Sequence, residues 1–406
     1  MHTVLLQGKT NFPSSRLFDA ALAAGPLTVI ADADADHRYD ERVSVHRVAD
    51  TRDAIAVRGV LMQIKRQRKV DQLVTLFERH QATGGYLRGI LGLPGRDFAT
   101  AVNLSSKLAM KRRYRSAGIP TSDFDVAFTL EEVKTIAGTL GWPIVVKPIM
   151  SSGCSNVVAF HDSAELEKFL ASDSRAAAMA ALDMPFIVER FVDMIDEYHC
   201  DGVVSDGTIT FVSASRYLQP LLGCSDDRNG STLLPSSDHD AQAIFELHAR
   251  VVAALGMRDG VTHLELFKTE SGFLAGEIAG RVAGGGIPEA ILLRHGVDLW
   301  AVDFDLACGR RPRIEPRTSN DYVVNLLLPA RPGIIRRISE ANDFSGLPGV
   351  VRVDMTRRIG DTIPPEMHSS SSSGIVYLSL PDETAIEAAV KGVMERFRLS
   401  VEIPEA

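Results

Sequence analysis

Two glutamates between His263 and Arg281 are the residues best suited to chemistry in this sequence. Glu265 and Glu277 lie twelve positions apart, and the run Glu-Ser-Gly-Phe at 270–273 is typical of a hairpin turn. A hairpin would place them on adjacent strands, where two carboxylates repel each other unless a cation lies between them. Paired carboxylates suit Mg²⁺, which takes its remaining ligands from phosphate and water. The alternative is a surface hairpin with two solvated glutamates.

Two lysines could bind phosphate. Lys147 ends the apolar run Ile-Val-Val-Lys-Pro, and a loop of small residues follows at 151–156. Such a loop lets backbone N–H groups approach phosphate oxygens, and the lysine adds a positive charge. Lys107 lies on a basic helix that Gly118 and Pro120 end. The alternatives are an ordinary hairpin after a strand-end lysine and, for Lys107, a solvated side chain. No G-x-x-x-x-G-K-[ST] motif occurs, which excludes a Walker A loop.

A third group of residues could hold a nucleoside. Glu189 lies at the end of an apolar strand, Phe191 follows it, and Glu197 comes shortly after. An acceptor, an apolar ring and a second carboxylate in this order suit a purine and a ribose. The alternative is a strand followed by an acidic turn.

Composition limits the class of protein. A length of 406 residues indicates two or three domains. A net charge of −8 argues against a broad nucleic-acid-binding surface, and no apolar run is long enough for a membrane span. The first residues do not read as a signal peptide. The four cysteines form no C-x-x-C pair, so we expect free thiols in a reducing cytoplasm.

The order of the expected elements indicates α/β and α+β architecture. Strand, helix and strand alternate in residues 1–100, which predicts a small parallel α/β domain. A central domain at 101–310 follows, with a smaller subdomain at about 121–200. Residues 219–238 are rich in Pro, Gly, Asp and Ser and are interpreted as a loop. Residues 311–406 predict a small α+β domain.

Together, these motifs resemble the ATP-grasp superfamily. Members have a lysine on a helix that ends in Gly-Ile-Pro, a V-V-K-P strand before a small-residue loop, and a V-E-x-F hinge with a later glutamate. They end in H-x-E, a turn, and E-I-x-x-R followed by Gly-Gly. All of these occur here, from Lys107 to Gly286. The E-I-A-G-R-x-A-G-G motif and the later G-I-I-R-R-I segment most resemble those of the dipeptide-forming L-amino acid ligase branch.

The resemblance implies an ADP-forming carboxylate–amine ligase that uses ATP and two Mg²⁺ ions, makes an acylphosphate and acts in specialised metabolism. Its substrates would be a small carboxylic acid and an amine or amino acid, with no nucleic acid or membrane partner, and it could form a homodimer. It assigns Arg281 to catalysis and Glu265 and Glu277 to the metal. It assigns ATP to Lys107, Lys147, Ser152, Gly153, Ser155, Glu189, Phe191 and Glu197, and the substrate to His263, Gly284, Gly285 and Gly286.

Two departures from the superfamily pattern concern this assignment. Many members have Asp before the first lysine, where this chain has Ser106, and Asn two residues after the second glutamate, where it has Ala279. The missing amide would weaken the second metal position. Two other functions stay open: a purine-biosynthesis or biotin-carboxylase type of ATP-grasp enzyme, and a nucleotide-binding protein without turnover.

Overall fold

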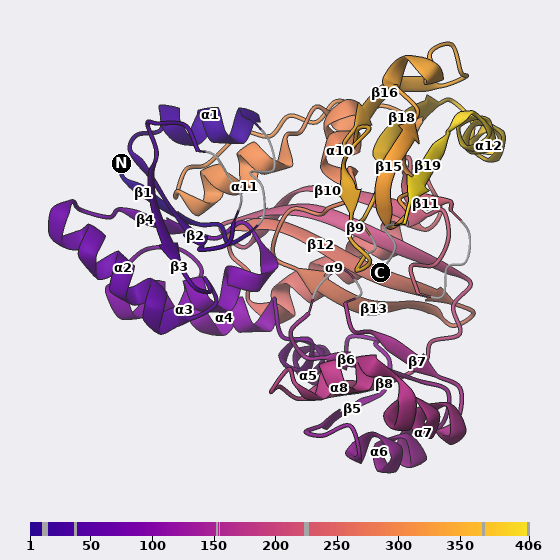
Figure 1. The fold of residues 1–406 in the computed structure, drawn as a ribbon, viewed down its shortest axis with the longest axis horizontal. Helices are drawn as coiled ribbons and strands as arrows, with labels where there is room; N and C mark the ends of the chain where they lie inside the picture. The colour runs from indigo at the N-terminus through magenta and orange to yellow at the C-terminus, as the bar shows by residue number, and fades with distance from the viewer. Residues whose placement is uncertain are drawn as a thin grey trace.

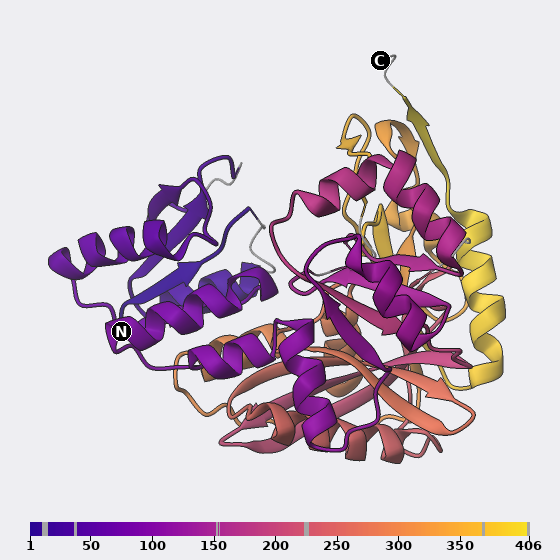
Figure 2. The same cartoon turned by 90° about the horizontal axis from the view of Figure 1, so that it is seen from below.

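The computed structural model describes residues 1–9, 15–35, 39–151, 153, 155–222, 227–367 and 370–403. The described residues form four sheets with helices packed against them (Figure 1). The N-terminal region stands apart as its own lobe in a second view (Figure 2). None of the described helices is long and apolar enough to cross a membrane.

The N-terminal sheet is parallel, with the order β3–β2–β1–β4. All residues of β1 and β2 are buried, as expected for parallel strands covered on both faces. The predicted parallel α/β domain is therefore confirmed. Its elements are β1 (Thr3–Leu6), α1 (Ser15–Ala23), β2 (Leu27–Asp32), β3 (Ser44–Val48), α2 (Ala54–Gln67), β4 (Gln72–Val74), the 3₁₀ helix η1 (Glu78–His80) and α3 (Gln81–Leu91).

A helix from much later in the chain packs against this N-terminal sheet. Helix α11 (Leu299–Ala307) lies beside α1 in Figure 1. Phe304 from α11 is buried in one apolar cluster with Leu5 and Leu17. This contact joins the N-terminal domain to the centre of the protein and brings η1 close to the central sheet.

The second sheet is antiparallel, with the order β5–β8–β6–β7, and it carries the predicted strand that ends near Lys147. An apolar cluster that includes Val133, Ile144 and Phe169 joins it to its helices. The elements from α4 onward are α4 (Phe98–Asn103), α5 (Lys107–Ser116), β5 (Phe124–Ala127), α6 (Glu132–Leu140), β6 (Ile144–Pro148), β7 (Val158–Phe160), α7 (Ser163–Ser172), α8 (Ser174–Ala180) and β8 (Phe186–Arg190).

The largest sheet is antiparallel and crosses the centre of the molecule, with the order β13–β12–β9–β10–β11–β14–β18–β16. The predicted hairpin with Glu265 and Glu277 is present in it at residues 260–279, and residues 196–217 form a second hairpin. The elements in its first part are β9 (Asp196–Ser205), β10 (Thr208–Tyr217), β11 (Asn229–Leu233), α9 (Ala241–Leu255), β12 (Gly260–Thr269), β13 (Gly272–Ala279) and α10 (Ile287–His295).

Strand β11 corrects the interpretation of residues 219–238 as a loop. Residues 229–233 pair with β10 on one side and β14 on the other. The sequence Asn-Gly-Ser-Thr-Leu has low intrinsic strand propensity, and its strand form is set by these two neighbours. Tertiary pairing therefore overrides the local signal.

The C-terminal region is α+β, as predicted. Its first strand continues the central sheet through the pairing of β11 with β14, so the hydrogen-bonded sheet crosses the predicted boundary near residue 310. A separate sheet has the order β17–β15–β19. The elements are β14 (Tyr322–Leu328), β15 (Gly333–Ile338), η2 (Ala341–Phe344), β16 (Val350–Met355), β17 (Thr362–Ile363), β18 (Gly374–Leu380), η3 (Glu383–Ala385), α12 (Ile386–Arg396) and β19 (Leu399–Glu402).

The β11–β14 pairing depends on a glycine. A Cβ atom at Gly230, whose φ is +149°, would lie 2.1 Å from the backbone oxygen of Asn325. We expect Gly230→Ala to lower the free energy of unfolding by about 3 kcal/mol, because both overpacking and backbone strain oppose it. Urea unfolding measures this loss. The matched control is Gly207→Ala, where φ is +79° and no atom lies within 4 Å; its loss should be about 1 kcal/mol. Equal losses would contradict the packing argument.

Candidate active site

Lys107, Lys147 and Glu277 meet between the second sheet and the central sheet. The ammonium groups of Lys107 and Lys147 lie 2.9 Å and 3.0 Å from the two carboxylate oxygens of Glu277. Burial alone would raise the pKa of Glu277, but the two lysines outweigh it and lower the pKa to about 2. Ser106 caps the helix that begins at Lys107, and this cap fixes the backbone position of the lysine. The cluster therefore gathers side chains from α5, β6 and β13.

Glu189 contacts Lys147 from another side and also pairs with a further lysine, Lys111. Its carboxylate lies 3.0 Å from the ammonium of Lys111 and 3.2 Å from that of Lys147, and it accepts a hydrogen bond from the Ser122 hydroxyl at 2.5 Å. Burial would raise the pKa of Glu189, but Lys111 and Lys147 lower it. The side chain predicted to face a purine thus supports the lysines. A cavity adjoins these charged side chains, and Glu189 lines it together with Phe191 and Glu197.

Two further carboxylates, those of Glu197 and Glu265, face this cavity without a lysine partner at ion-pair distance among the described contacts. Glu265 and Glu277 line the same cavity from adjacent strands of the predicted hairpin, at a bulge in their register. Burial and the charge of Glu277 raise the pKa of Glu265. Burial and the charge of Glu265 raise the pKa of Glu197, although its carboxylate accepts the Leu221 N–H at 2.7 Å. A divalent cation would relieve this repulsion, so the donor set fits Mg²⁺.

Arg281 stands at the border with a second, larger cavity. Its guanidinium donates to one carboxylate oxygen of Glu78 at 2.8 Å and 3.1 Å, and to the Val282 carbonyl at 2.9 Å. Glu78 comes from η1 of the N-terminal domain, so two domains fix the arginine. The larger cavity has a volume of about 460 Å³, within the range of small-molecule sites. Its wall includes His263, Arg281, Gly284, Gly285, Trp300, Asn325 and Leu327.

The glycine loop gives this cavity room. A Cβ atom at Gly284 or Gly285 would meet no atom closer than 3.8 Å, whereas one at Gly286 would lie 2.7 Å from the Tyr377 hydroxyl. Gly284 and Gly285 line the cavity, and Gly286 is required by packing and by its φ of +80°. Of the predicted substrate residues, these two glycines and His263 therefore reach the space directly.

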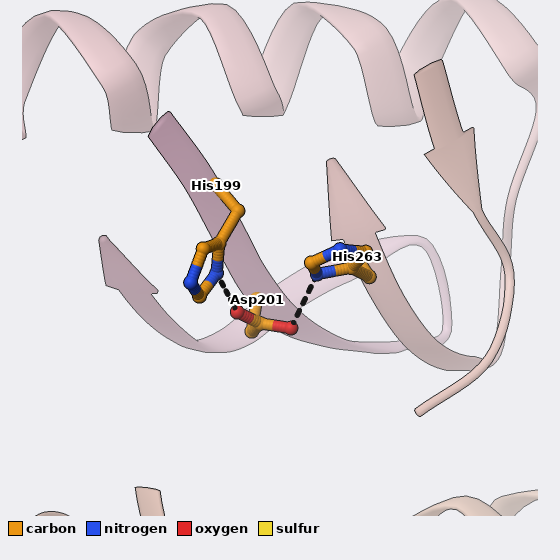
Figure 3. Close-up of side chains that lie close together, drawn as sticks. All are labelled: His199, Asp201 and His263. Carbon is orange, nitrogen blue, oxygen red and sulfur yellow. Dashed lines mark hydrogen bonds and ion pairs between the residues drawn. The ribbon is translucent and has the colours of Figure 1, made fainter. Parts of the chain in front are cut away.

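His263 is held from behind by a buried acid. Figure 3 shows Asp201 between two imidazole rings. One of its oxygens lies 3.0 Å from Nδ1 of His263, and the other lies 2.6 Å from Nδ1 of His199. Burial would raise the pKa of Asp201, but the two histidines lower it. Two histidines and an aspartate could also bind a metal ion, but each ring here faces a different oxygen at hydrogen-bond distance.

The structure describes only part of the small-residue loop at 151–156, which was predicted to bind phosphate. Ser152 lies outside the described residues. Gly153 lines both cavities, while Ser155, predicted with it, is not among the described residues that line them. The Lys107 ammonium donates to the Ser151 carbonyl at 2.6 Å, which ties this loop to α5.

Several residues of the site were missed by reasoning from the sequence. Lys111 is four residues after Lys107 on the same helix, a spacing that places both on one face and could have indicated it. Asp201 is two residues after His199 on a strand, which places both side chains on one face of the sheet. Glu78 and Ser122 carried no local signal.

Two protein-family models match the chain. A family model described as "ATP-grasp domain" matches residues 112–288, and one described as "L-amino acid ligase C-terminal domain 2" matches residues 325–402. The chain is similar to the L-arginine-specific L-amino acid ligase of Bacillus subtilis, with 31% identity over 87% of this chain and 86% of the relative. It is 24% identical to the dapdiamide A synthase of Enterobacter agglomerans over 69% of this chain and 68% of that protein.

Solved structures show the same fold at lower sequence identity. An L-amino acid ligase from Bacillus licheniformis superposes with a TM-score of 0.79 at 19% identity, over 99% of this chain and 98% of that one. An N5-carboxyaminoimidazole ribonucleotide synthetase from Thermotoga maritima gives a TM-score of 0.68 at 14% identity, over 99% of both chains.

The buried lysines make Glu189 important for stability. Glu189→Gln would leave Lys111, whose side chain is fully buried, without its carboxylate. Breaking one partner of a buried pair costs about 3–5 kcal/mol, and urea unfolding without added ligand should show this loss. The control is Glu167→Gln, which removes a carboxylate paired with Lys134 at the surface. It should change the free energy of unfolding by less than about 1 kcal/mol. A Glu189→Gln loss as small as the control would show that the pair is solvated.

Proposed function

The chain belongs to the L-amino acid ligase family of the ATP-grasp superfamily, whose members join a carboxylate to an amine with ATP, and from this premise we propose that it links two amino acids. The bond formed would be an amide of the dipeptide type, with ADP and phosphate as the other products. The step that activates the acid would be formation of an acylphosphate. These finer assignments rest on the arrangement of the two cavities.

The single observation that carries the proposal is the junction of those cavities. Glu265 lines both. A small third cavity shares lining residues with each of them, and its wall includes Lys107, His263, Glu277 and Arg281. A phosphate group held by the lysines would therefore meet a carboxylate that enters from the larger cavity. That arrangement suits transfer of the γ-phosphoryl group to a carboxylate, which depends on positioning and charge neutralisation.

The smaller cavity is the proposed ATP site. Val145, Phe191, Met194, Leu222 and Phe267 give it apolar walls suited to a flat base. Lys107 and Lys147 would bind phosphate oxygens, and the loop with Ser152, Gly153 and Ser155 would cover them. Glu197 would face the ribose. Glu189 would act indirectly, by holding Lys111 and Lys147 in place.

Glu265 and Glu277 are the proposed ligands of Mg²⁺. The ion would supply Lewis-acid charge that offsets the negative charge of the phosphates. Two ions are expected, with the second held more weakly because Ala279 stands where many superfamily members have an asparagine. When phosphate takes over Lys107 and Lys147, the Glu277 carboxylate becomes available to a cation.

Arg281 is the proposed catalytic residue. Its planar guanidinium suits both a phosphoryl group and the oxyanion that forms when the amine attacks. Glu78 keeps it aimed at the junction. Residues 284–286 would leave room for the acyl substrate, and a closed site would protect the acylphosphate from water.

The decisive experiment is a product screen. The protein is incubated with ATP, Mg²⁺ and pairs of L-amino acids, and ADP release is measured together with mass spectrometry of the products. A dipeptide mass with stoichiometric ADP supports the proposal. ADP release with bicarbonate instead of amino acids would favour the biotin-carboxylase type, and binding of ATP without any turnover would favour the non-catalytic alternative.

A role in specialised metabolism, a cytoplasmic location and a homodimer remain predictions from the family resemblance. Gel filtration tests the last of these.

Arg281→Ala is expected to lower kcat by about 10²–10³, since it removes a donor to the transition state. The Kd for ATP should stay within about twofold, because ATP is held by Lys107 and Lys147. Arg281→Lys should recover little of the rate, because an ammonium lacks the guanidinium fork. Steady-state kinetics and calorimetric ATP binding separate the two quantities. A parallel loss of ATP affinity and turnover would argue against the role in catalysis.

Glu265→Gln is expected to separate metal binding from stability. The raised pKa of Glu265 means that folding disfavours its charge at neutral pH, so the neutral amide should not lower the melting temperature of the free protein. Mg²⁺-dependent ADP binding should weaken by roughly tenfold or more. Glu277→Gln is the comparison, because it also removes the partner of two lysines and should lower the melting temperature. Unchanged Mg²⁺ dependence in Glu265→Gln would exclude this metal assignment.

A further inference from the structure

A row of buried polar side chains crosses the central sheet, from the phosphoryl-transfer junction to the glycine loop. Beyond Asp201 and His199, the row continues through Ser231, whose hydroxyl lies 2.8 Å from Nε2 of His199 and 2.8 Å from Oδ1 of Asn325. Asn325 then donates from Nδ2 to the Gly285 carbonyl at 2.8 Å. The residues His263, Asp201, His199, Ser231 and Asn325 are called the buried network below.

The far end of the buried network has a fixed direction. The Gly285 carbonyl can only accept, so the Asn325 amide presents its N–H there and its oxygen to Ser231. The single hydroxyl hydrogen of Ser231 is then used on Asn325, and the serine oxygen lies 2.8 Å from Nε2 of His199. Each group therefore depends on its neighbour for a satisfied hydrogen bond. None of the three inner residues is exposed, with 0% accessibility for His199, Asp201 and Ser231.

Strand register sets this arrangement. The network residues lie on β12, β9, β11 and β14, which are consecutive in the sheet apart from β10. His263 is directly opposite Asp201, and Ser231 is directly opposite Asn325. A row of apolar side chains would fill the same face without the cost of burying five polar groups. The two ends of the row, His263 and Asn325, both line the larger cavity, and so does Gly285.

We propose that the buried network positions the Gly284–Gly286 loop relative to the phosphoryl-transfer junction, so that the acyl substrate lies in line with the phosphate. This inference rests on the proposed function and assigns a positioning role to residues that touch neither ATP nor metal. Asn325 holds the loop by one carbonyl, and Asp201 holds the His263 ring beside Glu265. Loss of an inner link would loosen the loop and leave the ATP site unchanged.

The test removes the central hydroxyl with Ser231→Ala. A buried hydrogen bond that is left unsatisfied typically accounts for about a tenfold effect. We expect the KM for the acyl-donor amino acid to rise about tenfold and the phosphate released per amide formed to exceed one. The KM for ATP should stay within twofold.

The matched control is Ser213→Ala. Ser213 is also buried, lies on neighbouring β10 and has its hydroxyl 3.3 Å from a histidine nitrogen, that of His295, away from the site. It should leave all three kinetic quantities unchanged. A general loss of packing in the sheet would affect both serine variants alike.

A double-mutant cycle tests whether the residues act as one unit. Asn325→Leu keeps a similar shape and removes the bond to Gly285. If the network is continuous, Ser231→Ala in the Asn325→Leu background should add less than twofold to the KM for the acyl donor. Independent tenfold effects that multiply would overturn the proposal, as would a Ser231→Ala enzyme that behaves like Ser213→Ala. Absence of any amide from the wild-type protein would overturn the proposed function, and with it this role.

Discussion

The balance of charge around Glu277 is the constraint on which the rest of the structure depends. Four glutamates face one cavity: Glu189, Glu197, Glu265 and Glu277. Their negative charge is partly balanced by three lysines: Lys107, Lys111 and Lys147. Buried charges are stabilised where an opposite charge lies at close range, as it does at Glu189 and Glu277. The lysines come from α5 and β6, and the glutamates come from β8, β9, β12 and β13. Folding of this region therefore requires the second sheet and the central sheet to assemble together.

The same charge balance divides the carboxylates of the cavity into two groups. Glu189 has a lowered pKa and stays with Lys111 and Ser122, so it fixes the lysines at their base. Glu265 and Glu197 have raised pKa values, which shows that their charge is disfavoured in the folded protein. One part of the cluster is thus structural, and the other stores unfavourable charge that a cation can relieve. In the proposed site, Glu265 serves metal binding, Glu189 serves stability, and Glu277 serves both.

The sequence was sufficient to predict those elements of the site that depend on residues close together in the chain. The hairpin with Glu265 and Glu277, the helix that starts at Lys107 and the strand that ends near Lys147 are each set by residues close in the chain. Partners from distant segments were not predictable. Glu78 and Arg281 lie 203 residues apart in the sequence and meet where the N-terminal domain packs against the rest of the protein. Strand β11 takes its hydrogen bonds from β10 and β14. The ion pair of Glu189 with Lys111 likewise joins residues that are far apart in the sequence.

Because the central sheet continues into the C-terminal domain, residues of that domain line the larger cavity. The family match for the C-terminal domain begins at residue 325, and the Asn325 side chain reaches the glycine loop that follows the ATP-grasp hairpin. Leu327 and Ser370 also line the larger cavity, as do Phe77 and Glu78 from the N-terminal domain. Three parts of the chain thus enclose one space, while Lys107 and Lys147, the proposed phosphate ligands, both lie in the central part of the chain. Changes in the outer walls can alter the size of that space without disturbing the lysines. Changes at β11 or β14 would also shift the loop next to Arg281, because backbone pairing and side-chain hydrogen bonds connect them.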